Sequence, residues 1–271
     1  MKANLSEIIK NFLIPIGLAV LFLGPALQPG SVFNLDLILI PNPALSDGFW
    51  GIGPELGRTS PSAALLTLIS NFIPATISFK ILFISIFQLS WLGMSRLARE
   101  IGIRSPFLAS VLYTTSPFLL TRISVGHLGI SLMFALLPWT ISTLLRPTQN
   151  LQKLFLYSTA MAFAGYASGS ITLLIVVIGC IFAKATFGRR ICAITVAALA
   201  QSVWLVPGVV VALSSTRHLP PANVFATNFG TGILQLFSPS AGGGFWNPSF
   251  QVGPAMGVLE LMGFLLLFIA I

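Results

Sequence analysis

Runs of mostly apolar residues follow one another along this 271-residue chain, separated by polar, basic or proline-rich segments. Each run comes close to the roughly 20 residues that an α-helix needs to cross a bilayer. The chain is 55% hydrophobic and 7% charged, with a mean hydropathy of +0.94, so a water-soluble fold would expose large apolar surfaces. The runs are continuous rather than alternating in polarity, which argues against a membrane β-barrel. The sequence therefore predicts an all-α, polytopic membrane protein.

About eight transmembrane helices are expected, in a single transmembrane domain that covers residues 1–271. The predicted spans are residues 11–27, 79–95, 106–121, 126–145, 152–166, 169–186, 191–213 and 255–271. A further apolar segment, residues 60–78, is short and interrupted by Asn71 and Pro74. We expect this segment to lie at the membrane surface as an interfacial helix rather than to form a ninth span.

Positive charge decides between these topologies, because loops on the inner side of a membrane are enriched in Lys and Arg. If residues 60–78 are interfacial, ten of the fourteen basic residues lie inside: Lys2, Lys10, Arg96, Arg99, Arg104, Arg146, Lys153, Lys184, Arg189 and Arg190. If the segment spans, only five of the fourteen lie inside. The first topology predicts a multi-pass protein of the plasma membrane with a cytoplasmic N-terminus. The net charge of +8 then reflects cytoplasmic loops and not a nucleic-acid surface.

Two long segments lie on the outer face in this topology, residues 28–78 and residues 214–253, whereas the inner connections are short. Long loops commonly carry binding or catalytic residues, so we expect function on the outer face. Each loop holds a Phe-Trp pair, which includes Trp50 in the first and Trp246 in the second. These Trp side chains either anchor the loops at headgroup level or line a groove for a lipid or a sugar.

Three of the six acidic residues, Asp36, Asp47 and Glu55, fall in the first outer loop. Asp36 stands among leucines, and a carboxylate next to apolar surface favours a role as a base. The alternative is that Asp36 caps a short loop helix. Asp47 begins an Asp-Gly pair, for which a turn is the simpler interpretation. Both residues are candidates for catalysis.

Arg122 and His127 are expected at an outer turn between two helices, close to the membrane surface. Arg suits a phosphate because its fork donates two hydrogen bonds, and His can donate or accept a proton there. The alternatives are an Arg that reaches to lipid headgroups and a His that bonds a backbone carbonyl. Arg217 and His218 repeat these residue types in the second outer loop. No Walker loop, dinucleotide fingerprint, zinc-protease motif or serine-nucleophile elbow is present in the sequence.

This pattern resembles the GT-C superfamily of integral membrane glycosyltransferases, including members that act in actinobacterial cell-envelope assembly. The matching stretches are "FNLDLILIPNP", "SRLAREIGIRSPFLASVLYTTSPFLLTRISVGH" and the loop from Ser214 to Gly253. In that family a long first outer loop carries a catalytic acid, and a basic inner turn leads to a short helix that ends in a motif like "SPFLLTR".

The resemblance implies transfer of a sugar from a polyprenyl-phosphate donor to a glycan acceptor at the outer face of the bilayer. Asp36 would be the general base, with Asp47 as its nearest rival, and Arg122, His127 and Arg217 would hold the lipid phosphate. Some members use a divalent metal, but the sequence offers no ligand set for one. Two other hypotheses remain open, a transporter or flippase of lipid-linked sugars and an inactive fragment or structural subunit of a glycan-assembly complex. The chain ends within the apolar run "GVLELMGFLLLFIAI", which favours an N-terminal fragment of a longer protein.

Overall fold

A computed structural model of the protein describes residues 7, 9–30, 33–34, 37–38, 60–146, 148 and 150–214. Helices dominate this part of the chain. They are η1 (Ile9–Leu13, a π-helix), α2 (Ile14–Leu27), α3 (Ser60–Ser70), α4 (Ala75–Glu100), α5 (Pro106–Thr114), α6 (Pro117–Val125), α7 (Leu128–Leu145), α8 (Leu151–Ala162), α9 (Tyr166–Phe182), α10 (Phe187–Ala200) and α11 (Ser202–Ser214). Two short strands, β1 (Phe33–Asn34) and β2 (Leu37–Ile38), pair in antiparallel fashion.

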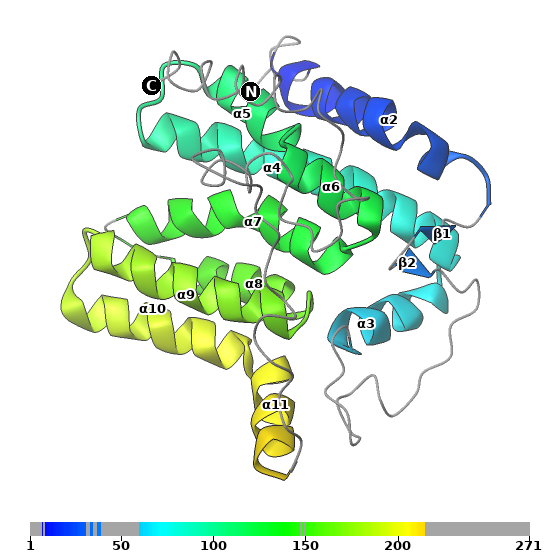
Figure 1. Ribbon diagram of the computed structural model, residues 1–271. Coiled ribbons are helices and arrows are strands. Elements are labelled where there is room, and N and C mark those ends of the chain that lie inside the picture. Colours follow the sequence, from blue (N-terminus) through cyan, green and yellow to red (C-terminus); the bar gives the residue numbers. More distant parts are fainter. Residues whose placement is uncertain are drawn as a thin grey trace, which may run out of the picture.

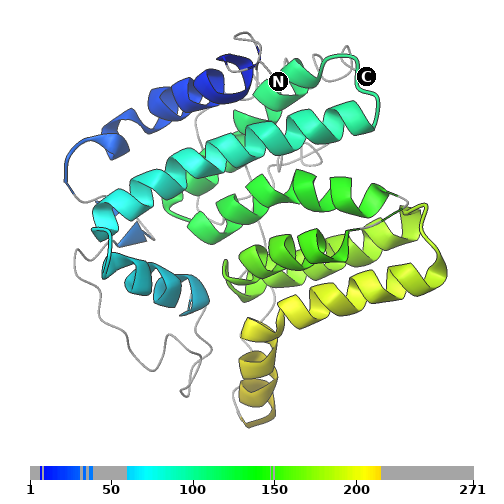
Figure 2. The same ribbon diagram turned by 180° about the vertical axis from the view of Figure 1, so that it is seen from behind.

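The helices stack in layers, with α4 between α2 and α7, and with α7 between α4 and the pair of α8 and α9 (Figures 1 and 2). Helix α10 packs on α8 and α9 from the far side. The apolar core is divided in the same way. One cluster joins α2, α4, α6 and α7 and includes Phe83, Phe87 and Leu119, and another joins α7 to α10 and includes Leu144, Leu154 and Val176.

The all-α prediction is confirmed for the described residues. In the part of the chain that the structure describes, two helices, α4 and α7, are long and apolar enough to cross a membrane. The apolar helices Asn11–Leu27 and Ser168–Phe182 are shorter. The predicted span at residues 255–271 lies outside the described residues.

The predicted span at residues 106–121 is wrong in one respect, because it is two helices, α5 and α6. Pro117 disfavours a helical conformation in the residue before it and has no N–H to continue a helix. The hydroxyl of Ser116 accepts a hydrogen bond from the N–H of Leu119, with Oγ and N 3.4 Å apart, and so caps the start of α6. The serine-proline pair therefore ends one helix and begins the next.

The predicted span at residues 191–213 is also divided, at Gln201, where the chain turns from α10 into α11 (Figure 1). The Gln201 side chain is buried, and its Nε2 donates to the carbonyl of Ser158 at 2.8 Å. Trp204 Nε1 in turn donates to Gln201 Oε1 at 2.5 Å.

The segment at residues 60–78 also differs from the sequence prediction. Helix α3 ends at Ser70, and residues 75–78 already belong to the long helix α4. Phe33–Asn34 and Leu37–Ile38 pair as strands, with Asn34 opposite Leu37. Asp36 itself lies outside the described residues, so the alternative that it caps a loop helix stays a prediction.

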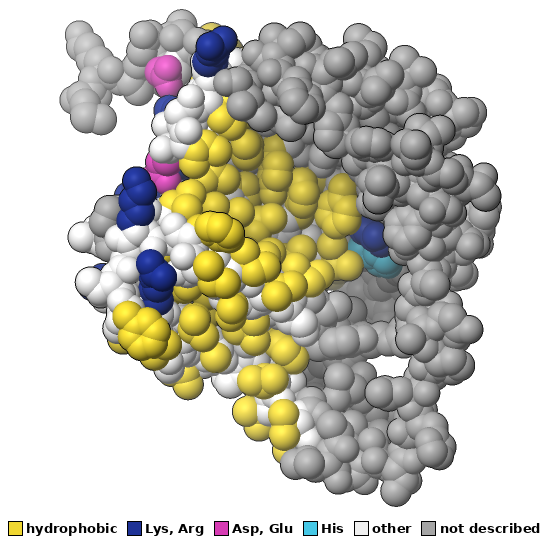
Figure 3. All heavy atoms as spheres, turned by 60° about the vertical axis from the view of Figure 1, so that its left-hand side comes forward, with side chains coloured by type: hydrophobic (Ala, Val, Ile, Leu, Met, Phe, Trp, Pro, Cys, Tyr) yellow, Lys and Arg dark blue, Asp and Glu magenta, His cyan; other side chains and the backbone are white. Residues whose placement is uncertain are grey.

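Charge and hydrophobic surface are separated in space. Figure 3 shows Lys and Arg side chains along one edge of the molecule, a broad hydrophobic surface beside them, and a His side chain at the opposite edge of that surface. The exposed cations Arg99, Arg104, Lys153, Lys184 and Arg189 lie at or near the end of α4, the starts of α5, α8 and α10, and the end of α9. We call this border the basic edge.

A clamp joins α4 to α7 near the basic edge. Trp139 Nε1 donates to the carbonyl of Leu89 at 3.0 Å, and the Arg96 guanidinium lies 5.6 Å from the centre of the Trp139 ring. Gly93 allows this approach, since a Cβ added there would lie 2.5 Å from Trp139 Nε1. Glu100 then pairs with Arg96 and Arg146, and it accepts a hydrogen bond of 2.5 Å from Ser142. Three consecutive turns of α4, from Leu89 to Glu100, are thereby fixed against α7.

Two prolines inside helices leave a carbonyl without its backbone N–H donor, and in each case a side chain of a neighbouring helix donates a hydrogen bond instead. Pro15 cannot donate to the carbonyl of Asn11, and Gln88 Nε2 of α4 donates to that oxygen at 2.5 Å. Pro138 likewise cannot donate to the carbonyl of Phe134, which instead accepts the hydroxyl of Tyr113 at 2.6 Å. Such side-chain donors are how apolar helices tolerate proline.

Removing the Tyr113 hydroxyl tests this account. We expect Tyr113→Phe to lower the free energy of unfolding by about 1 kcal/mol, because the carbonyl of Phe134 loses its donor. In a Pro138→Ala background the N–H introduced at position 138 can donate to the carbonyl of Phe134. Tyr113→Phe should then lower the free energy of unfolding much less. Thermal unfolding of the four proteins in detergent measures the difference.

Tyr157→Phe is the matched control, because the Tyr157 hydroxyl has no hydrogen-bond partner among the described residues. This variant should unfold like the wild type. An equal cost of Tyr113→Phe in both backgrounds would contradict the proposed role of the proline.

Candidate functional site

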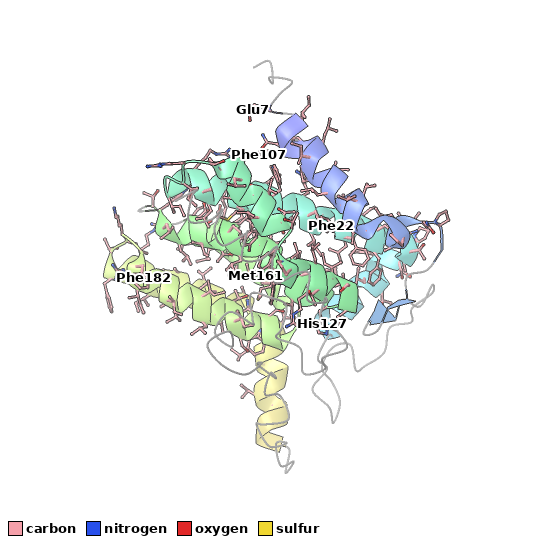
Figure 4. The ribbon with its side chains drawn as sticks, turned by 45° about the horizontal axis from the view of Figure 1, so that its top comes forward. Glu7, Phe22, Phe107, His127, Met161 and Phe182 are labelled. Carbon is pink, nitrogen blue, oxygen red and sulfur yellow. The ribbon has the colours of Figure 1, made fainter. Side chains whose placement is uncertain are left out.

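Arg122 and His127 meet at the turn between α6 and α7, with Arg122 Nη1 3.3 Å from His127 Nδ1. Figure 4 places His127 at the opposite end of the bundle from Phe107 and Phe182, which mark the start of α5 and the end of α9. The pair therefore lies at the end away from the basic edge. Both side chains are partly buried.

The backbone of the turn brings the pair together. Gly126 follows the last residue of α6 in the left-handed conformation, with φ of 94°. The N–H of His127 donates to the carbonyl of Arg122 at 2.8 Å, and the N–H of Gly126 donates to that of Ile123 at 3.0 Å. These two bonds form a Schellman motif, for which glycine is the preferred residue at the left-handed position. The sequence "RISVGH" thus fixes its first and last residues against each other.

Three aromatic rings in mutual contact pack against the Arg122 side chain. Its guanidinium carbon lies 5.3 Å from the centre of the Phe118 ring, one helical turn earlier. Phe118 contacts Phe134 of α7 at 5.3 Å between ring centres, and Phe134 stacks on Tyr113 of α5 at 4.1 Å. Tyr113 also donates its hydroxyl to the Phe134 carbonyl. The same residues that satisfy the proline-freed carbonyl therefore hold the Arg side chain in place.

The electrostatics of the pair favour an anion. Burial lowers the pKa of the Arg122 guanidinium, but an arginine begins from so high a value that it keeps its charge. Since the guanidinium can only donate, His127 Nδ1 accepts, and the ring proton is assigned to Nε2. A half-buried guanidinium beside an imidazole N–H can bind a phosphate or a carboxylate.

The other residues predicted for the site lie outside the described residues. They are Asp36, Asp47, Trp50, Arg217 and His218. The paired strands that precede and follow Asp36 lie beside the start of α4 (Figure 1). Lys80 near that start donates to the carbonyl of Gln28 at 2.5 Å, which joins α4 to the end of α2.

Within the described ranges, no three His, Cys, Asp or Glu side chains come close enough together to hold a metal ion.

Sequence reasoning missed the residues that support the pair, namely Tyr113, Phe118 and Phe134. Part of the signal was available, because Phe118 precedes Arg122 by one helical turn and Pro138 follows Phe134 by four residues. The partner of that freed carbonyl comes from 21 residues earlier in the chain, on another helix. Only the folded structure identifies it.

The chain matches no family model, no curated protein and no solved structure.

Replacing Gly126 by alanine tests the turn. We expect Gly126→Ala to lower the free energy of unfolding by about 1–2 kcal/mol, because an alanine in the left-handed conformation brings its Cβ too close to the following carbonyl. The measurement is thermal unfolding in detergent. Gly188→Ala is the matched control, since Gly188 lies in the first turn of α10 and an added Cβ there meets nothing within 4 Å. Equal destabilisation by both changes would contradict the role given to Gly126.

Proposed function

We propose that this protein is a multi-pass membrane protein of glycosyltransferase type, with the pair of Arg122 and His127 on its outer face. The pair binds the phosphate of a polyprenyl-phosphate sugar donor, and the sugar passes to a glycan acceptor. The observation that carries this proposal is the side-chain pairing of Arg122 and His127 at the end of the bundle away from the basic edge.

The position of the pair suits a lipid that carries a phosphate. A broad hydrophobic surface extends along the flank of the bundle and reaches the edge where a His side chain lies (Figure 3). A polyprenyl chain can pack along such a surface while its phosphate stays at the polar rim. Arg122 supplies a fixed positive charge there, because the ring of Phe118 and the Nδ1 of His127 orient its guanidinium.

The chemistry of the transfer uses this charge. The acceptor hydroxyl attacks the anomeric carbon of the sugar, and the bond from that carbon to the phosphate oxygen breaks. Negative charge grows on the departing phosphate, where Arg122 and the N–H of His127 stabilise it. In this proposal Asp36 removes the proton of the acceptor hydroxyl, and Asp47 is the alternative base.

The orientation follows from charge. We propose eight spans, with the basic edge in the cytoplasm, a cytoplasmic N-terminus, and residues 28–78 and 214–253 outside. Ten of the fourteen Lys and Arg residues then face inward. The exposed cations of the described residues gather at one edge of the hydrophobic surface, in accord with this orientation.

A transporter or flippase is the competing function. Such proteins place charged groups near the middle of several spans. In the part of the chain that the structure describes, α7 carries no Asp, Glu, Lys or Arg, and those of α4 lie near its two ends. This distribution favours chemistry at the surface.

Sugar transfer from a polyprenyl-phosphate donor in membranes tests the proposed site. We expect Arg122→Gln to lower the rate roughly 100- to 1000-fold, which is the usual effect of removing one donor to a developing negative charge. Arg122→Lys should recover only part of the rate, because a lysine cannot donate in a bidentate fork. Lys80→Gln removes a cation outside the proposed site and should leave transfer near the wild-type rate. Equal effects of the two glutamine variants would exclude a specific role for Arg122.

The proposed base is tested in the same assay. Asp36→Asn should abolish most transfer, and Asp47→Asn should reduce it less. Unchanged transfer by Asp36→Asn would remove Asp36 from this role. Absence of transfer by the wild type would favour an inactive fragment or a structural subunit.

Topology has its own test. A reporter domain fused near Arg104 should be found in the cytoplasm, because Arg104 belongs to the basic edge. An external reporter would overturn the orientation.

A further inference from the structure

The turn between α9 and α10 exposes two large apolar side chains next to two cations. Phe182 ends α9 and is 74% exposed, and Phe187 begins α10 and is 79% exposed. Lys184 lies between them in the chain, and Arg189 follows within the first turn of α10. Leaving two phenylalanines in water costs several kcal/mol in total, at roughly 1.5–3 kcal/mol for each ring. Such a pair of rings is instead typical of a surface that meets lipid.

Arg190 fixes the shape of this turn. Its Nη2 donates to the carbonyl of Ala183 at 2.8 Å, and its Nε donates to the carbonyl of Ala185 at 3.0 Å. These bonds satisfy carbonyls just past the end of α9, which the helix itself leaves without donors. The guanidinium of Arg190 thus makes its hydrogen bonds within the turn. The Lys184 side chain, which lies between Ala183 and Ala185 in the chain, is exposed.

The depth of the turn relative to a bilayer follows from α9. Every exposed side chain of this helix from Ile171 onward is apolar, and together they form a stripe: Ile171, Leu174, Val177, Ile178, Ile181 and Phe182. At about 1.5 Å per residue, the stripe is roughly 17 Å long. Lys184 comes two residues after its last member. If the stripe contacts acyl chains, Lys184 lies at headgroup depth, and Figure 4 shows Phe182 at the outermost end of the bundle.

We propose that the α9–α10 turn is a binding site for the headgroup of an anionic phospholipid. Lys184 and Arg189 contact the phosphate group, while Phe182 and Phe187 pack against the upper part of the acyl chains. This inference rests on the membrane placement in the proposed function. The site is separate from the Arg122 pair, which lies at the other end of the bundle.

The charge and the apolar surface of the α9–α10 turn together indicate which class of ligand binds there. The basic edge borders hydrophobic surface directly, as Figure 3 shows, so its ligand must present negative charge and apolar surface side by side. An anionic phospholipid has both features. Free phosphate lacks the apolar part, and a zwitterionic phospholipid lacks the net charge.

Native mass spectrometry of the full chain, released from nanodiscs of phosphatidylglycerol and phosphatidylcholine, tests the site. We expect the wild type to retain phosphatidylglycerol in preference. Lys184→Gln/Arg189→Gln should reduce that preference roughly 25-fold, at about fivefold for each cation near the surface. Arg99→Gln/Arg104→Gln removes the same charge from the same edge and should change the preference much less.

A second variant separates a lipid from an ion. Phe187→Ser leaves both cations in place, and it should still weaken retention of phosphatidylglycerol, because the acyl chains lose a contact. Unaltered retention in Phe187→Ser would overturn the lipid contact and leave a simple phosphate site.

Two further outcomes distinguish failure of the lipid site from failure of the proposed membrane placement. Equal loss of preference in the two double variants would replace the site by diffuse attraction to the whole edge. Failure of the wild type to enter nanodiscs of either lipid would instead overturn the membrane placement on which the proposed function depends.

Discussion

A proline inside a helix leaves a carbonyl oxygen without its usual backbone donor, and this arrangement of helices depends on how that oxygen is satisfied. In apolar surroundings no water replaces the missing N–H, so a side chain from a neighbouring helix has to reach it. Gln88 does this for Asn11, and Tyr113 does it for Phe134. Gln88 therefore joins α4 to η1, just before α2, and Tyr113 joins the end of α5 to α7.

The second of these bonds also determines the geometry of the candidate site. Tyr113 contacts Phe134 through both its hydroxyl and its ring, and Phe134 in turn contacts Phe118, over which Arg122 lies. An aromatic column thus connects the interior of α7 to the polar rim. At the other end of α7, Glu100 and Trp139 fix the helix to α4. Helix α7, which begins directly after His127, is therefore bonded to neighbouring helices near both of its ends.

Apolar run length and charge were enough to predict that the described residues are mainly helical and where most of their helices lie, because both are local properties of the sequence. The breaks near Ser116 and Gln201 were harder to predict. A proline marks the first break, but the second also involves Gln201 bonded to Ser158, which is 43 residues away. For the site, the turn that joins Arg122 to His127 could be predicted from "RISVGH". Its supporting rings could not, since Tyr113 and Phe134 come from different helices.

The Schellman motif at Gly126 has a consequence for the order of folding. Arg122 and His127 are five residues apart, and the bonds that join them are among the shortest-range contacts in the chain. Contacts of this kind close quickly because little chain entropy is lost in forming them. The pair can therefore form with α6 and its Phe118 ring, before α5 and α7 add the rings of Tyr113 and Phe134. The pairing of Arg122 with His127 is then formed early in folding, and the later packing of the bundle restricts the motion of the two side chains.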